Sequence, residues 1–478
     1  MTAERFDLIV IGSGSGNTLI TRKWLSQESG QGRSRTAAII DAGTFGGTCL
    51  NAGCIPTKMF VYPAGLARSA AVEAPPLGVD TELNGVRWQQ IRDRIFGRID
   101  PISSSGRNYR AEDPAVTLIE ETVRFTGPRT LVTSSGRVLE GGQIVIAAGS
   151  HPVLLDIPGA DLPQVHTSET VMRIDALPQR MLVIGGGAIA AEFAAIFSGF
   201  GSEVTQLIRS PQLLESADPL ISQKFTAAAA KQWRLLPETS ADRIEAAGPG
   251  TVRVFANNGF AEEFDLVLIA IGRKASTAAL GADFDTRPSG ALMVNQYQQV
   301  LKDGKPVPGV WALGDITNDY QLKHVANHEA RVVAHNMTHP EQLEAVLHSR
   351  SLPPVPAAVF THPQIAMLGM TSPEAETYAA ENGIEITEYV QSYGDTAYGW
   401  AMEDTESVAK VIAEKATGRL LGAHIIGPEA SILIQPLIQA MSFSTDLRVF
   451  ARGQYWIHPA LTEVVENAVL GLDFDPLD

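Results

Sequence analysis

Short apolar runs that end in glycine are the main pattern along the first two thirds of the chain. Residues 6–17 (FDLIVIGSGSGN) and 181–192 (MLVIGGGAIAAE) each join an apolar run to closely spaced glycines and a helix-compatible segment. This order predicts a buried parallel strand, a tight turn and a helix, as in a dinucleotide-binding unit. Residues 263–273 (EFDLVLIAIGR) and 309–317 (GVWALGDIT) predict further buried strands that end in glycine turns.

The strand expected after each glycine turn ends in a different kind of residue. After the first turn, TAAIIDAG predicts a strand that ends in Asp41, where such folds hold a ribose hydroxyl. After the second turn, SEVTQLIRS predicts a strand that ends in Arg209, and a basic residue there favours the 2′-phosphate of NADP(H). The alternative for each motif is an ordinary glycine-rich turn, which can occur in any α/β protein. Two such motifs, each followed by a matching residue at the end of the next strand, argue against this alternative.

The pattern changes from about Leu352, after which a Pro-rich stretch leads into alternating runs. Residues 407–415 (SVAKVIAEK) and 420–427 (LLGAHIIG) predict two strands joined by a turn at 416–419, and residues 430–443 are helix-like. This α+β segment is predicted to be a third domain or an oligomer interface.

Length and charge limit the class of protein. A chain of 478 residues predicts two to four domains. Asp and Glu number 53 against 37 Lys and Arg, a net charge of −16, which argues against nucleic-acid binding. No apolar run approaches a membrane span and the N-terminus lacks a signal-peptide pattern, so we expect a soluble, cytoplasmic protein without membrane contact.

The two cysteines of the chain, Cys49 and Cys54, both lie in residues 46–58 (GGTCLNAGCIPTK). A regular helix would separate them by about 7.5 Å along its axis, beyond the roughly 7 Å limit for a disulfide, so a bridge needs a bent segment. Glycines permit that bend, and Pro56 suits a helix that starts just after Cys54. The N-terminus of such a helix would lower the pKa of the Cys54 thiol. A structural disulfide, a zinc half-site and two buried thiols are the alternatives; two dinucleotide motifs favour a redox pair.

The segment 46–58 is similar to the redox-active disulfide motif of the flavoprotein disulfide reductases, the glutathione reductase and dihydrolipoamide dehydrogenase group. The resemblance covers the whole chain in order, through both glycine turns and the motifs AAGS (147–150), AIGR (270–273), ALGD (312–315) and HPALTE (458–463). Further stretches resemble the members that use NADPH to reduce the disulfide of a sugar-based thiol: 44–64, 96–102, 324–333, 393–405 and 451–472.

This resemblance implies an α/β fold with two Rossmann-like domains and an α+β dimerisation domain. FAD would bind residues 1–155 and 276–350, NADPH residues 156–275, and residues 351–478 would form the dimer interface. Asp41 would hold the ribose of FAD, and Asp315 would hold its ribitol chain. Lys58 and Glu192 would form an ion pair beside the flavin. The implied cofactor-binding residues are Gly12, Gly14, Asp41, Thr48, Lys58, Gly149, Gly185, Gly187, Ala190, Glu192, Arg209, Gly272 and Asp315.

The resemblance also implies the catalytic roles. Cys49 would be the interchange thiol that attacks a substrate disulfide, and Cys54 the thiol that lies against the flavin. His458, oriented by Glu463, would be the acid/base and would come from the other subunit of a homodimer. Pro459 suits the first turn of a helix, which would hold His458 at its start; a helix cap without chemistry is the alternative for this histidine.

Some positions depart from the family pattern. Glu215 replaces a second basic residue of the NADPH site, and Ala188 replaces a bulky residue that covers the flavin in relatives. His324 and His328 are four residues apart, but the HExxH zinc motif fails because position 332 is Val and not His, so no metal is predicted. The alternative functions are a dihydrolipoamide dehydrogenase, against which Arg209 counts, and an FAD-binding redox sensor, against which the complete catalytic set counts.

Overall fold

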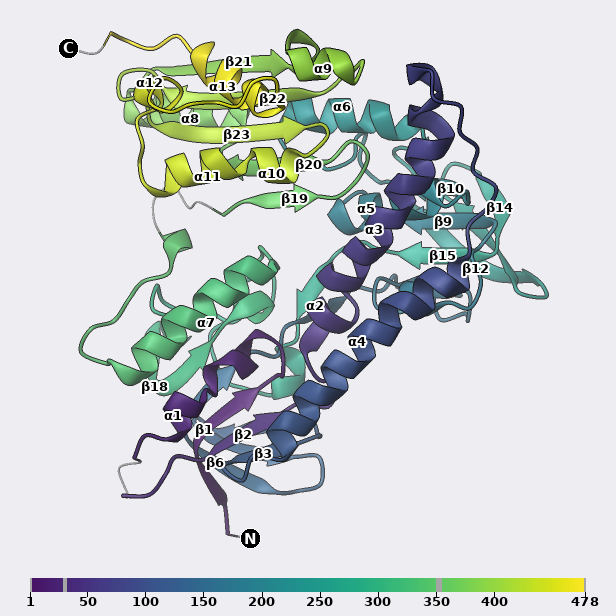
Figure 1. Cartoon of the computed structure of the whole chain (residues 1–478). Coiled ribbons are helices and arrows are strands. Elements are labelled where there is room, and N and C mark those ends of the chain that lie inside the picture. Colours follow the sequence, from purple (N-terminus) through teal and green to yellow (C-terminus); the bar gives the residue numbers. More distant parts are fainter. Residues whose placement is uncertain (1, 29–31, 350–354, 477–478) are drawn as a thin grey trace.

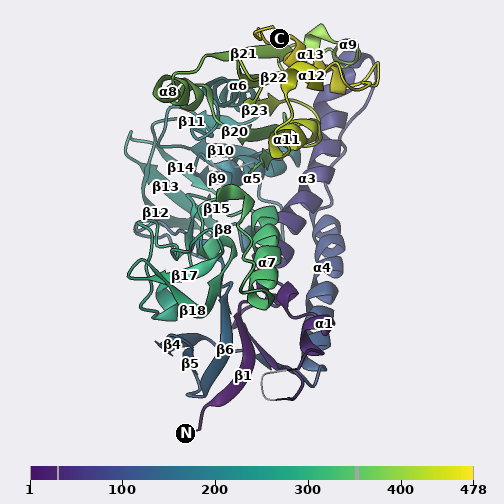
Figure 2. The same cartoon turned by 90° about the vertical axis from the view of Figure 1, so that its left-hand side faces the viewer.

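The computed structural model describes residues 2–28, 32–349 and 355–476. Three large sheets follow one another along the molecule: the first lies at one end with the N-terminus, the second beside α5 (Ala188–Gly199), and the third at the other end with the C-terminus (Figures 1 and 2). Helices and strands alternate in the first two, so the predicted α/β class is confirmed. No helix within the described ranges is long and apolar enough to cross a membrane.

The first sheet has a parallel centre with the order β18-β6-β1-β2-β3, and β17 is added antiparallel at one edge. The apolar run at residues 6–11 lies in β1, as expected, and the strand is buried from Leu8 to Ile11. Residues 305–312, far along the chain, return to pair with β6. The strands are β1 (Glu4–Ile11), β2 (Ala37–Ile40), β3 (Val116–Ile119), β4 (Val123–Gly127), β5 (Thr130–Thr133), β6 (Val138–Ile146), β17 (Gln299–Lys302) and β18 (Lys305–Ala312).

The second sheet is fully parallel and has the order β11-β10-β9-β15-β8. Its middle strands are buried on both faces, which accounts for their unbroken apolar sequences. An antiparallel ribbon, β12-β13-β14, packs beside it. The strands are β8 (Val165–Thr167), β9 (Arg180–Ile184), β10 (Glu203–Leu207), β11 (Arg234–Leu236), β12 (Ala241–Gly248), β13 (Thr251–Ala256), β14 (Ala261–Phe264) and β15 (Leu266–Ile269).

The third sheet is antiparallel, with the order β19-β20-β23-β22-β21. Its hairpin β22-β23 matches the predicted strands at 407–415 and 420–427, so the predicted α+β segment is confirmed, whereas residues 351–354 of the Pro-rich stretch lie outside the described residues. The helix-like stretch 430–443 forms two helices, because Pro436 begins a new one. The strands are β19 (Ala357–Val359), β20 (Ile365–Gly369), β21 (Ile386–Ser392), β22 (Val408–Glu414) and β23 (Leu420–Ile426).

Two long helices, α3 and α4, run beside the sheets (Figure 1). Phe60 of α3 stacks on Trp88 of α4, with 5.1 Å between the ring centroids, and both pack against α5 of the second sheet. The helices of the molecule include α1 (Arg22–Leu25), α2 (Gly47–Asn51), α3 (Cys54–Arg68), α4 (Trp88–Ala111), α6 (Pro219–Ala230), α7 (Lys323–Thr338), α10 (Ala430–Leu433), α11 (Gln435–Ser442) and α13 (Thr462–Leu470).

Candidate active site

The two cysteines lie on either side of a break between two helices. Cys49 is in α2, and Cys54 is the first residue of α3, with Gly53 as its N-cap. A Cβ atom on Gly53 would come within 2.9 Å of the Thr48 carbonyl oxygen and 3.2 Å of the Cys49 Cα, so only glycine lets the chain fold back this closely. The predicted bend is confirmed; the helix begins at Cys54 itself, two residues before Pro56.

The two thiols interact directly and differ in acidity. The Cys49 thiol hydrogen-bonds to the Cys54 sulfur, and this bond is the first cause that lowers the pKa of Cys54, to about 7; the nearby Lys58 charge adds to it. The same contact, followed by burial, raises the pKa of Cys49, while the charge of Lys323 acts in the opposite direction. In the reduced pair, the negative charge is therefore favoured on Cys54, at the start of α3.

The predicted ion pair between Lys58 and Glu192 is confirmed. The Lys58 Nζ atom lies 2.7 Å from both carboxylate oxygens of Glu192, one turn beyond Cys54 on α3. The Phe360 N–H donates to Glu192 Oε1 at 2.9 Å, and the ammonium group lies 4.4 Å from the centroid of the Phe360 ring. The sequence did not single out Phe360, because neither its backbone N–H nor its ring forms a recognisable motif with Lys58 and Glu192, which lie far away along the chain.

The first glycine turn is joined to Asp41 and to the cysteine helix. Asp41 follows β2 and accepts hydrogen bonds from the Ser13 N–H at 2.8 Å and the Ser13 hydroxyl at 2.5 Å. A Cβ on Gly14 would meet only Gly47, at 3.8 Å, so bare backbone faces this space; Thr48 lies next to it in α2. Gly12 is in the left-handed region at φ +104° and packs on Ala147.

The segment after this turn is shorter than a typical Rossmann helix. It forms a 3-10 helix, Ser15–Leu19, and then α1, because Thr21 caps a new helix by accepting from the Trp24 N–H. Asn17, which stands where the usual motif has glycine or alanine, binds the buried Arg110 through its side-chain and backbone oxygens at 2.8 and 2.9 Å. The turn therefore carries a buried positive charge that the sequence pattern did not predict.

Three distant motifs meet at one place. The Ser150 hydroxyl donates to Asp315 at 2.8 Å and accepts from the Arg273 Nε–H at 2.9 Å, and Arg273 also binds Glu169 at 2.8 Å. These residues come from the motifs at 147–150, 270–273 and 312–315. Gly149 and Gly272 within them have positive φ and no atom within 4 Å of a Cβ position, so both are open at this junction.

The second glycine turn leads into α5 and lies beside the loop that carries Arg209. Gly185 packs on Ala270, Gly187 has nothing within 4 Å of a Cβ position, and Ala190 is buried. The Leu214 N–H donates to the Gly186 carbonyl at 2.9 Å, which holds the loop against the turn. Arg209 and Glu215 are exposed on this loop, Arg209 two residues beyond the end of β10, and Ala188 is exposed at the start of α5.

His458 and Glu463 form a hydrogen-bonded pair, with 2.7 Å between Nδ1 and Oε1. The expectation that His458 starts a helix is wrong: α13 begins at Thr462, and His458 precedes it in a loop with a cis peptide bond to Pro459. The imidazole side chain is 67% exposed and, among the described residues, it hydrogen-bonds neither cysteine. Figure 1 shows α13 at the C-terminal end of the molecule and α2 near its middle.

Helix α7 lies beside the first glycine turn and the Asp315 turn. Glu329, fully buried, accepts from the Gly314 N–H at 2.6 Å and from the Asn318 side chain at 2.9 Å, and burial raises its pKa to about 8. His324 binds the Pro356 carbonyl, and His328 accepts from the Leu347 N–H. Within the described ranges, no three or more His, Cys, Asp or Glu side chains are grouped to hold a metal ion.

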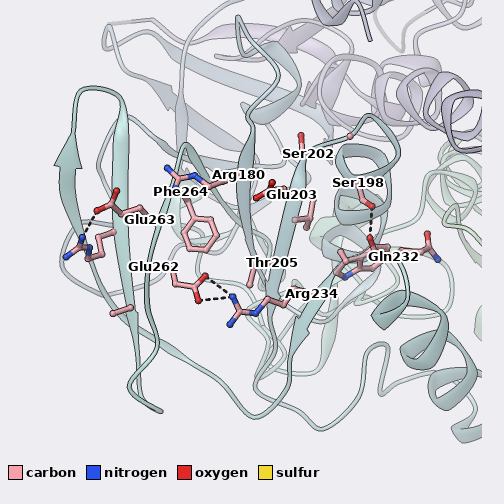
Figure 3. Close-up of a pocket in the computed structure, with 15 residues that line it drawn as sticks. Arg180, Ser198, Ser202, Glu203, Thr205, Gln232, Arg234, Glu262, Glu263 and Phe264 are labelled. Atoms are coloured by element: carbon pink, nitrogen blue, oxygen red, sulfur yellow. Dashed lines mark hydrogen bonds and ion pairs between the residues drawn. The ribbon is translucent and has the colours of Figure 1, made fainter. Parts of the chain in front are cut away.

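A large pocket lies at the end of the second sheet that is opposite to the second glycine turn. It has a volume of about 740 Å³ and is bounded by the N-terminal ends of β9, β10 and β11 (Figure 3). Its Arg234 and Arg253 are paired with Glu262 and Glu263 at 2.8 and 2.5 Å. Because the glycine turn follows the C-terminal end of β9, where nucleotides bind in such sheets, this pocket is separate from the predicted nucleotide site.

Comparison with known proteins fits this arrangement of two dinucleotide units and a cysteine pair. Residues 6–330 match the family model for pyridine nucleotide-disulphide oxidoreductases, and residues 355–469 match the model for the dimerisation domain of these enzymes. The chain therefore belongs to the pyridine nucleotide-disulphide oxidoreductases, a family of flavin-dependent disulfide reductases, and the predicted family is confirmed.

Individual relatives show which members of the family the chain is similar to. Mycothione reductase from Mycobacterium tuberculosis is 45% identical over 480 residues, which cover 98% of this chain and 100% of that protein. Dihydrolipoyl dehydrogenase from Synechocystis is 30% identical over 97% of this chain and 98% of the relative. Among solved structures, the HOCl-induced flavoprotein disulfide reductase RclA from Escherichia coli has a TM-score of 0.80 at 25% identity and covers 97% of this chain and 99% of its own.

Proposed function

We propose that the protein reduces mycothione, the disulfide of the sugar-based thiol mycothiol, with electrons from NADPH that pass through FAD and the Cys49–Cys54 pair. The observation that carries this proposal is the hydrogen-bonded pair of thiols at the break between α2 and α3, with Lys58 and Glu192 beside it. The substrate assignment is supported by the 45% identity with mycothione reductase over nearly the whole chain. We propose the cytoplasm as the compartment, since a reducing environment suits this chemistry.

The residues around the first glycine turn and the turn at Asp315 fit FAD. Because Gly14 and Gly47 carry no side chains, the backbone of the first turn and of the start of α2 could approach a pyrophosphate closely, and Asp41 and Asp315 supply carboxylates for the ribose and ribityl hydroxyls of FAD. FAD bound there would carry two electrons between the nicotinamide and the cysteine pair. We assign it to residues 1–155 and 276–350, with the N-terminus of α7 at the edge of the flavin, and we assign residues 351–478 to the dimer interface.

NADPH would bind residues 156–275, over the second glycine turn. Gly187 leaves open backbone before α5, and Arg209 on the adjoining loop supplies a positive charge for a 2′-phosphate. Glu215, exposed on the same loop, opposes that charge, so we expect NADPH to be preferred over NADH without strict exclusion of NADH.

The cysteines would perform the disulfide exchange. The Cys49 thiolate forms a bond to one sulfur of mycothione, the substrate S–S bond breaks, and the departing thiolate takes a proton to become the first mycothiol. The Cys54 thiolate then attacks Cys49, which restores the Cys49–Cys54 disulfide and releases the second thiolate for protonation. The low pKa of Cys54 keeps this resolving sulfur ionised near neutral pH.

The proton for the first leaving thiol would come from His458 of the partner subunit. Glu463 accepts a hydrogen bond from Nδ1, which leaves Nε2 to exchange the proton. Large apolar side chains near this histidine are exposed: Tyr455 fully and Ile457 to 77%. We infer that a second copy of the chain packs against them. This segment lies within the stretch that matches the family's dimerisation domain, so we propose a homodimer with two shared active sites.

Steady-state oxidation of NADPH by the purified FAD-loaded protein tests the function. Mycothione, glutathione disulfide and lipoamide are compared as substrates, and NADH is compared as reductant, with Cys49→Ser as the control. We expect turnover with mycothione and NADPH that Cys49→Ser abolishes. Preferred turnover of lipoamide with NAD(H) would instead support a dihydrolipoyl dehydrogenase, the activity named for the Synechocystis relative.

A further inference from the structure

Lys323 is a cation at a position where a helix disfavours one. It is the first residue of α7, whose first turn contains no acidic side chain. Its Nζ–H donates to the Ser15 hydroxyl at 2.8 Å; across the described part of the chain, this is its one hydrogen bond, and it takes part in no ion pair. The positive end of the helix dipole and the ammonium group of the half-buried Lys323 therefore repel each other, and no acidic side chain among the described residues pairs with this lysine.

Such a conflict points to a negative charge that forms during function. Asn327, one turn further along α7, also contacts the Ser15 hydroxyl, with 3.3 Å between the oxygens. Asparagine and serine neutralise no charge, so the surroundings fix the lysine without reducing its field. The other lysine near the cysteines, Lys58, differs because Glu192 pairs with it.

Ser15, the partner of Lys323, lies next to the turn that contacts the start of α2, where Cys49 is located. Ser15 follows Gly14, and a Cβ on Gly47 would come within 2.9 Å of the Gly14 Cα, so the glycine turn and the start of α2 touch. Cys49 is two residues beyond Gly47, in the same turn of α2. The charge of Lys323 acts to lower the pKa of Cys49, against the hydrogen bond to Cys54 and the burial of the thiol.

We propose that Lys323 is a positioning residue that favours the thiolate form of Cys49 in the reduced enzyme. The proposal rests on the proposed function, since it concerns the sulfur that attacks the substrate. Each cysteine then has its own lysine. The charge of Lys58 favours the thiolate on Cys54, and Lys323 allows that negative charge to move to Cys49, where the attack on the substrate disulfide begins.

A purely structural role for Lys323 makes a different prediction. If the lysine served only to hold the glycine turn, removal of its Ser15 partner would have the same effect as removal of the lysine. Ser15→Ala abolishes the hydrogen bond and keeps the charge. Under the proposal, Ser15→Ala changes the titration of Cys49 far less than Lys323→Met does, whereas both variants can weaken FAD binding.

The test is cysteine-resolved alkylation of the reduced, FAD-loaded enzyme. The protein is reduced with dithiothreitol, desalted anaerobically and treated with iodoacetamide between about pH 6 and about pH 10, and peptide masses give the rate at each cysteine. In Lys323→Met, we expect the midpoint for Cys49 to rise by about one pH unit, which makes its alkylation about tenfold slower below the midpoint. Lys323→Arg should restore the midpoint, and Lys305→Met, which removes an exposed lysine of β18, should leave it unchanged.

An unchanged Cys49 midpoint in Lys323→Met would overturn the proposal, as would a Ser15→Ala variant that matches Lys323→Met. Lys323→Gln supplies the same comparison should the methionine variant fail to fold. No substrate enters this experiment, so its failure is distinct from failure of the proposed function. Wild-type protein that lacks activity with mycothione but shows the Lys323-dependent midpoint would refute only the substrate.

Discussion

Replacement of either partner of the Lys58–Glu192 pair should separate its structural role from its effect on the cysteines. The Glu192 side chain is 10% exposed and the Lys58 side chain 34%. Lys58→Met leaves a nearly buried carboxylate whose remaining donor, among the residues that the structure describes, is the Phe360 N–H. Loss of one member of a buried pair costs about 3–5 kcal/mol, and we expect about 3 kcal/mol because the pair is not fully enclosed. Glu192→Gln leaves an ammonium group that can turn towards water, so we expect a loss of about 1 kcal/mol.

The two substitutions should shift the pKa of Cys54 in opposite directions. The charge of Lys58 lowers this pKa, and that of Glu192 raises it. Lys58→Met therefore raises the pKa of Cys54 above its value of about 7, by about one unit, whereas Glu192→Gln lowers it. Both variants lose stability, but only one of them loses thiolate at neutral pH.

Two assays on the FAD-loaded protein measure these effects. Urea midpoints from tryptophan fluorescence give the change in stability, and a pH titration of the long-wavelength thiolate–flavin absorbance in the reduced enzyme gives the pKa of Cys54. Lys305→Met, with the same loss of charge at an exposed site, is the matched control. A greater loss of stability in Glu192→Gln than in Lys58→Met, or shifts of the Cys54 pKa in one direction, would refute the reasoning.

Other consequences concern the dimer, the nucleotide and pH. Mixed dimers formed from Cys49→Ser and His458→Gln subunits should recover about a quarter of wild-type turnover after random exchange, because each mixed dimer then has one intact shared site; no recovery would mean that a site uses the histidine of its own chain. Arg209→Ala should raise the KM for NADPH about tenfold with little change for NADH, and Glu215→Arg should lower it; equal effects on both nucleotides would contradict a contact with the 2′-phosphate. The folded pKa of Cys54 lies below that of a free thiol, so its contribution to stability is present above about pH 9 and is lost as the pH falls through about 7. The full shift corresponds to about 2.7 kcal/mol, but Cys54 is exposed and solvent screening should reduce this to about 1 kcal/mol. Urea midpoints at pH 7 and 9 should therefore rise with pH for the reduced enzyme relative to the oxidised one, and a fall would contradict the sign.

The sequence predicted those parts of the molecule that depend on local pattern. The apolar run before Gly12 and the hairpin after Ser407 appear as expected, because buried strands and tight turns impose strong local constraints. The bend between the cysteines was also predictable, since Gly53 is the one residue type that fits against Thr48 and Cys49. The resemblance to a family then supplied the ion pair between Lys58 and Glu192.

Features that depend on tertiary contacts were not predictable in the same way. His458 was expected to start a helix because Pro459 suits a first turn, but α13 starts only at Thr462. The short 3-10 helix after the first glycine turn followed from a cap at Thr21 that a glycine pattern does not reveal. The sequence did not single out Lys323, because its place at the start of α7 and its contact with Ser15 are seen only in the structure.

An anaerobic single turnover follows the transfer of electrons from the cysteine pair to the substrate disulfide. The FAD-loaded enzyme is reduced with one equivalent of NADPH and mixed rapidly with mycothione, glutathione disulfide or lipoamide, while flavin absorbance and released thiol are recorded. We expect that mycothione reoxidises the cysteine pair, that two thiols are released for each pair, and that Cys49→Ser releases none. Thiol release that persists in Cys49→Ser, or faster reoxidation by lipoamide than by mycothione, would contradict this expectation.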